Sequence, residues 1–107
     1  METKLRKVIK DFMNCNKSNQ NENIFRNDLA AQEFSKKVQS GNPKAQFERN
    51  GVVPTEFINY LQCAKIVQVD INWPKGSIKL KQLADLLEGC YKSVMIKRYP
   101  MLRRSFT

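Results

Sequence analysis

The residues of this sequence with the clearest chemistry are cations that gather near its C-terminal end. Among 107 residues there are 19 lysines and arginines against 10 aspartates and glutamates, a formal net charge of +9 at pH 7. No acidic residue follows Glu88, whereas five cations do: Lys92, Lys97, Arg98, Arg103 and Arg104. Such a region is typical of proteins that neutralise nucleic-acid phosphates, although a solvated basic tail would have the same composition.

Residues 80–98 resemble a helix-turn-helix, in which a tight turn joins two helices and the second helix enters the major groove. Ala84 supplies the small residue of the first helix, and Val94 lies where the second would return to the core. The turn glycine, Gly89, comes one position later than the motif requires. A plain pair of supporting helices is therefore the alternative interpretation of this segment.

Aromatic rings among the cations could stack on the bases of single-stranded nucleic acid. Tyr99, between Arg98 and Pro100, is the candidate for an exposed ring, whereas Trp73 is expected in the core. The candidate nucleic-acid-binding residues are thus Lys92, Lys97, Arg98, Tyr99, Arg103 and Arg104. The sequence leaves open DNA or RNA, and duplex or single strand.

Several classes of enzyme lack their residues in this sequence. There is no histidine, which removes the commonest general base and zinc ligand. The three cysteines, Cys15, Cys63 and Cys90, form no C-x-x-C pair, and we interpret them as reduced thiols. The four glycines are scattered and form no phosphate-binding loop. We expect a non-enzymatic protein without metal or cofactor.

The N-terminal residues 3–13 have the spacing of an amphipathic helix. Leu5, Val8, Ile9 and Phe12 recur at the three- and four-residue intervals of one apolar face. The cations Lys4, Arg6, Lys7 and Lys10 occupy its other sides. Three turns are marginal alone, so the apolar face must pack on something. The alternatives are its own domain, a second copy, an anionic membrane surface or another protein.

A second function follows from this helix. The chain could be a protein–protein interaction module, such as a viral, phage or plasmid accessory factor, whose partner-binding residues are Leu5, Val8, Ile9 and Phe12. The basic end would then steer association with an acidic partner. Residues 14–23, rich in asparagine, predict a linker. We therefore divide the chain into residues 1–23, helix and linker, and a single globular domain over 24–107.

Three further helices are expected in the middle of the chain. One spans residues 27–40, with Asn27 or Asp28 as its cap and Gly41 in the left-handed position after it. A short helix begins with Asn42 as cap and Pro43 at its first position, and ends at Asn50-Gly51. Another opens at Pro54 or Thr55. The inward residues predicted for the first of these are Leu29, Ala30, Phe34 and Val38.

After residue 65 the apolar spacing changes from helical to alternating. Val67, Val69, Ile71 and Trp73 alternate with polar residues, as in a half-buried strand. A turn and a second strand would complete a β-hairpin over residues 66–80. The alternative is a helix that Ser77 caps. The fold class is mainly α, a small domain of about five short helices with at most this one hairpin.

No apolar run is long enough to span a bilayer, and the N-terminal stretch lacks the continuous apolar segment of a signal peptide. These features predict a cytoplasmic protein. A homo-oligomer is compatible with both functions above.

Overall fold

The computed structural model describes residues 2–15, 25–63 and 73–87 of the chain. Within them, helices dominate and two short strands pair, which confirms the mainly α fold class. The elements, in chain order, are α1 (Glu2–Met13), α2 (Leu29–Gln39), α3 (Asn42–Asn50), β1 (Val52–Val53), α4 (Thr55–Cys63), β2 (Ile78–Lys79) and α5 (Leu80–Leu87).

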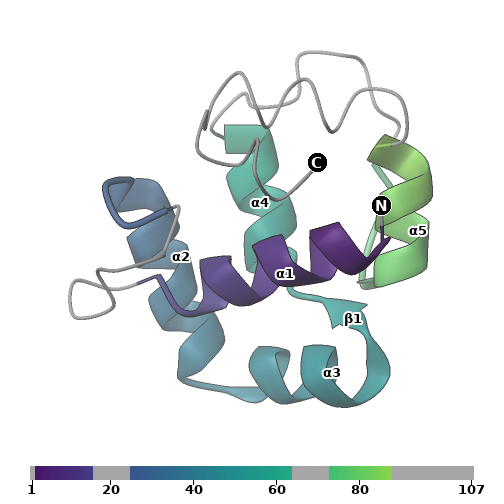
Figure 1. Cartoon of the computed structure of the whole chain (residues 1–107), viewed down its shortest axis with the longest axis horizontal. Coiled ribbons are helices and arrows are strands. Elements are labelled where there is room, and N and C mark those ends of the chain that lie inside the picture. Colours follow the sequence, from purple (N-terminus) through teal and green to yellow (C-terminus); the bar gives the residue numbers. More distant parts are fainter. Residues whose placement is uncertain (1, 16–24, 64–72, 88–107) are drawn as a thin grey trace.

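Helix α1 crosses the front of the molecule and packs against α2 and α5 (Figure 1). Its apolar residues Leu5, Val8, Ile9 and Phe12 are all 0% exposed. A three-turn helix gains most of its stability from such packing, because isolated helices of this length are marginal in water. Of the alternatives that the sequence left open, docking on its own domain is the one observed.

The ring of Phe12 lies at the centre of an aromatic cluster. Its centroid is 5.7 Å from that of Phe25, 5.1 Å from Phe57 and 5.5 Å from Tyr60. The contacts with Phe25 and Phe57 are edge-to-face, a geometry that aromatic pairs favour. Because these rings come from α1, α4 and the turn before α2, one side chain joins three parts of the chain.

Helix α2 begins and ends close to where expected, but its predicted inward face is only half right: Val38 is buried and Phe34 packs against the core, while the first two residues point outwards. Leu29 is 76% exposed and Ala30 is also exposed, whereas Ala31, Ser35 and Val38 are buried. The Asp28 side chain caps the helix by accepting a hydrogen bond from the Ala31 amide, at 3.2 Å. The buried face is therefore rotated by about one residue from the one that hydrophobicity alone selected.

Polar contacts with the end of α1 explain this rotation. The Ser35 hydroxyl donates to the backbone carbonyl of Cys15, and the Gln39 amide donates to that of Met13. Both carbonyls lie at the C-terminal end of α1, where a helix leaves acceptors unsatisfied. Two side chains of α2 thus satisfy backbone carbonyls at the end of α1. This contact requires Ser35 rather than Leu29 to face inwards.

Glycine conformations around α3 differ from expectation at one end and agree at the other. Gly41 is extended, with a φ of −157°, and is the N-cap of α3, so its predicted left-handed role is wrong. The helix consequently begins one residue early, at Asn42. At the other end Gly51 has a φ of 68° and donates from its N–H to the Phe47 carbonyl, at 3.0 Å. That left-handed cap favours glycine.

The small sheet joins segments that are far apart in sequence. Strands β1 and β2 are antiparallel, with Val52 opposite Lys79 and Val53 opposite Ile78. The strand predicted from residue 66 to Trp73 lies outside the described residues apart from Trp73, which has no regular structure. The sequence analysis missed β1, because two residues are too few to show a period.

Helix α5 follows β2 without a connecting loop. The amide of Lys79 donates to the Gln82 side chain at 2.8 Å, so a residue of the strand also serves as the start of the helix. Ile78 thus lies in a strand, but in the described residues that strand pairs with β1. The helix begins at Leu80, two residues later than the alternative with a Ser77 cap predicted. The helix corresponds to the first half of the segment that resembles a helix-turn-helix, and the second half lies outside the described residues.

We expect Phe12→Ala to destabilise the protein by about 3–5 kcal/mol, because it removes the shared ring of the cluster. The milder Phe12→Leu keeps most of the apolar volume, so it should cost less than the alanine substitution and keeps the effect measurable if the alanine variant fails to fold. The measurement is urea unfolding followed by circular dichroism. The control is Leu29→Ala, which also shortens an apolar side chain to alanine but at an exposed position. It should change the free energy of unfolding by less than about 0.5 kcal/mol. Equal losses at both positions would contradict the assigned core.

Candidate nucleic-acid interface

The six predicted C-terminal site residues all lie outside the described residues. These are Lys92, Lys97, Arg98, Tyr99, Arg103 and Arg104. Their assignment stays a prediction from the sequence.

The predicted partner-binding residues Leu5, Val8, Ile9 and Phe12 are described, and none of them is at the surface. Each is 0% exposed and packed inside the protein's own core. In this structure they present no surface to another protein. The sequence identified an apolar face correctly, but the local pattern could not tell what covers it.

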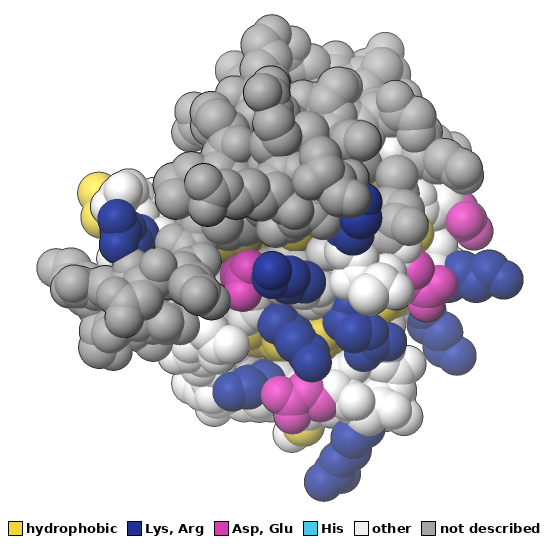
Figure 2. Space-filling view, in the orientation of Figure 1, with side chains coloured by type: hydrophobic (Ala, Val, Ile, Leu, Met, Phe, Trp, Pro, Cys, Tyr) yellow, Lys and Arg dark blue, Asp and Glu magenta, His cyan; other side chains and the backbone are white. Residues whose placement is uncertain are grey.

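The opposite side of the same helix is basic, and we call it the basic face of α1. It consists of Lys4, Arg6, Lys7 and Lys10, among which Lys7 and Lys10 are exposed and the other two are half-buried. Figure 2 shows lysine and arginine side chains gathering over α1 and α3 on the face in view, with acidic side chains among them. Burial of the apolar side fixes this orientation, because the cations have no other side of the helix to occupy.

Arg6 is held against α3 by an aromatic ring. Its guanidinium carbon lies 5.6 Å from the centroid of Phe47, within the range of a cation–π interaction. Phe47 is 0% exposed, so the arginine covers the ring while its charge stays near the surface. A guanidinium positioned in this way loses less conformational entropy when it binds a phosphate than a freely rotating side chain does.

Sequence reasoning recorded these cations but assigned no site to them. The available signal was their spacing, since Lys4, Lys7 and Lys10 recur every three residues on a helix whose apolar face was already evident. An amphipathic helix that docks by its apolar side necessarily displays its charged side.

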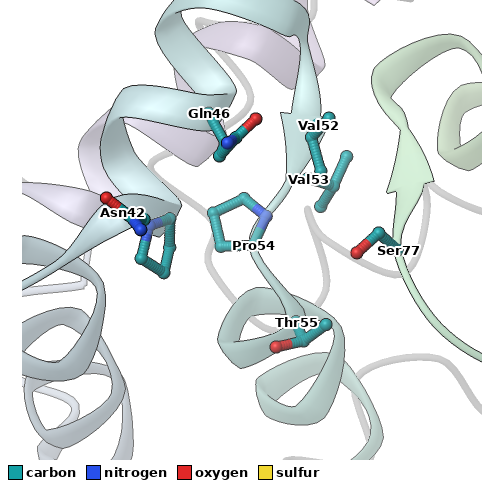
Figure 3. Close-up of a pocket in the computed structure, with 8 residues that line it drawn as sticks. Asn42, Gln46, Val52, Val53, Pro54, Thr55 and Ser77 are labelled. Carbon is teal, nitrogen blue, oxygen red and sulfur yellow. The ribbon is translucent and has the colours of Figure 1, made fainter.

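A cavity of about 180 Å³ lies between α3, β1 and the start of α4 (Figure 3). Its polar side chains are neutral: Asn42, Gln46, Thr55 and Ser77. Val52 and Pro54 supply apolar walls. Without a titratable group in its lining, this cavity offers neither acid–base chemistry nor a charged attraction for phosphate.

The polar groups nearest the aromatic cluster serve the fold. The Tyr60 hydroxyl donates to Asp28 at 2.6 Å, and the same carboxylate caps α2. Burial, together with the charge of Asp28, raises the pKa of the Cys15 thiol to about 12. This thiol is therefore protonated at neutral pH, which excludes it as a thiolate nucleophile.

In the three described ranges, no group of three or more histidine, cysteine, aspartate or glutamate side chains could hold a metal ion. None of the helices in that part of the chain is long and apolar enough to cross a membrane. The sequence matches no model of a known protein family, and comparisons with curated proteins and with solved structures found no match either.

The raised pKa of Cys15 predicts a pH dependence of stability. Between about pH 9 and pH 12 the unfolded chain loses the thiol proton, whereas the folded protein keeps it. Deprotonation therefore favours the unfolded state, and the free energy of unfolding decreases as the pH rises through this window. Below pH 9 both states hold the proton, so the thiol adds no pH dependence there.

The measurement is urea unfolding of the wild type and Cys15→Ala at pH 7 and at pH 10. The wild type should lose more stability than the variant between the two values. Cys63→Ala, which removes an exposed thiol, is the control and should follow the wild type. The same pH dependence in wild type and Cys15→Ala would show that this thiol titrates alike in both states.

Proposed function

We propose that this protein is a non-enzymatic nucleic-acid-binding protein that contacts the phosphate backbone. The observation that carries the proposal is the basic face of α1, where four cations lie within seven residues on the outer side of a helix whose inner side is buried. The acid-free C-terminal segment adds five cations by sequence. A surface of this kind attracts polyanions and releases their counterions on binding.

The described cavity and the described buried thiol support a binding rather than a catalytic role. The cavity between α3 and β1 has a neutral lining, and the buried cysteine Cys15 is held as a thiol. Backbone binding needs neither a pocket nor a general base, only cations at intervals that phosphates can meet. The proposal includes a cytoplasmic location, where thiols stay reduced.

The alternative of an acidic protein partner is less favoured by the structure. That alternative assigns the contact with the partner to Leu5, Val8, Ile9 and Phe12, which are buried in the core. A partner that bound them would have to displace α1 and open the aromatic cluster. Deleting residues 1–23 would remove that part of the core too, so a deletion cannot separate the two functions.

We expect fluorescence anisotropy with labelled duplex DNA, single-stranded DNA and RNA to show binding to at least one of them, weakened by salt. A slope steeper than about −3 in log affinity against log salt would correspond to several neutralised phosphates. Arg103→Ala combined with Arg104→Ala should weaken binding to all sequences alike, because phosphate contacts carry no sequence information.

A variant that retains full affinity would remove the C-terminal arginines from the site but leave the basic face of α1 in it. Flat titrations with all three nucleic acids at low salt would contradict the proposed function.

A further inference from the structure

We infer that the basic face of α1 binds the phosphate backbone of a double-stranded nucleic acid rather than a single strand. This inference rests on the proposed function and specifies the form of its ligand. It is carried by three features of the described residues: the spacing of the cations along α1, the contact that holds one of them, and the burial of the aromatic rings.

The cations lie on the outer side of α1, where Lys7 and Lys10 are exposed. Helix α1 is at the front of the molecule in Figure 1, and its apolar side is packed inwards. Lys4, Lys7 and Lys10 follow one another with a rise of about 4.5 Å per step along the helix. The phosphates of a duplex strand rise by about 3.4 Å each along its axis, so successive lysines can reach different phosphates.

The fixed position of Arg6 adds a preorganised contact. Its guanidinium lies over the Phe47 ring, on the same helix as Lys4, Lys7 and Lys10. A planar guanidinium can bind two phosphate oxygens at once, which needs a phosphate held at a defined place. The regular backbone of a duplex provides such positions, whereas a single strand must first be ordered.

Binding of single strands commonly needs exposed aromatic rings and a basic groove. In the part of the chain that the structure describes, five aromatic side chains are 0% exposed and Phe34 and Trp73 are half-buried against the core. The cavity near Pro54 has no cation in its lining. The described surface therefore provides charges for a backbone, whereas none of its described aromatic rings is fully exposed for bases to stack on.

An anionic membrane is the other polyanion that a basic amphipathic helix can fit. Membrane binding of that kind buries the apolar face among the lipid chains. Here that face is already occupied by the core, with Val8 and Phe12 both 0% exposed. A membrane would thus meet only the charges, without the apolar contribution that makes such helices bind firmly.

The test compares two double variants of equal charge by anisotropy over a salt series. Lys7→Gln with Lys10→Gln removes two exposed cations from the basic face of α1, and Lys36→Gln with Lys75→Gln removes two exposed cations elsewhere. The probes are a DNA duplex, an RNA duplex and a single DNA strand of the same length. We expect the wild type to bind a duplex more tightly than the single strand. The first variant should reduce the duplex salt slope by about 2, and the control by less than half of that.

The outcomes separate this inference from the function on which it rests. Equal reductions by both variants, or tighter binding of the single strand, would overturn the inference while nucleic-acid binding itself stands. No binding to any of the three probes would overturn the proposed function and the inference together, as would binding only to vesicles that contain phosphatidylserine. Whichever duplex is bound more tightly identifies DNA or RNA as the ligand.

Discussion

The docking of α1 is the constraint on which the rest of the structure depends. Its apolar side places Phe12 among rings from α4 and from the turn before α2, so the helix closes the core as well as contributing to it. Its C-terminal carbonyls are in turn satisfied by side chains of α2. The same docking leaves the cations of α1 facing outwards. The helix that stabilises the fold therefore also displays its charge.

Much of this fold could be predicted from the sequence, because most of its elements have local signals. Helix α1 has a strict apolar period, Asp28 caps α2, and Gly51 ends α3 in the left-handed conformation. The errors occurred where a distant residue decided the outcome. Ser35 is buried because a carbonyl twenty residues earlier needs a donor, and β1 exists only because β2 lies beside it. Neither requirement is visible within a window of local sequence.

At the candidate site, too, the sequence of α1 shows which side is apolar, whereas residues outside α1 decide what covers that side. The sequence established that one side of residues 3–13 is apolar and the others basic, and both features are present in the structure. Whether the apolar side binds the chain itself or a partner depends on whether the rest of the chain offers a complementary surface. Phe25, Phe57 and Tyr60 provide that surface, and no pattern within α1 refers to them. Leu5, Val8, Ile9 and Phe12, which the sequence suggested as partner-binding residues, are therefore buried in the core of the chain itself.

This division makes the two sides of α1 experimentally separable. Burying a large apolar side chain such as Ile9 or Phe12 contributes about 1.5–3 kcal/mol, so the inner side controls whether the domain folds. Exposed lysines contribute little to folding, and glutamine retains a high helix propensity, so Lys7 and Lys10 can be replaced with the core intact. A loss of binding in such a variant then reports on the surface rather than on stability. Removing the whole helix would confound the two, because the charge and the core would disappear together.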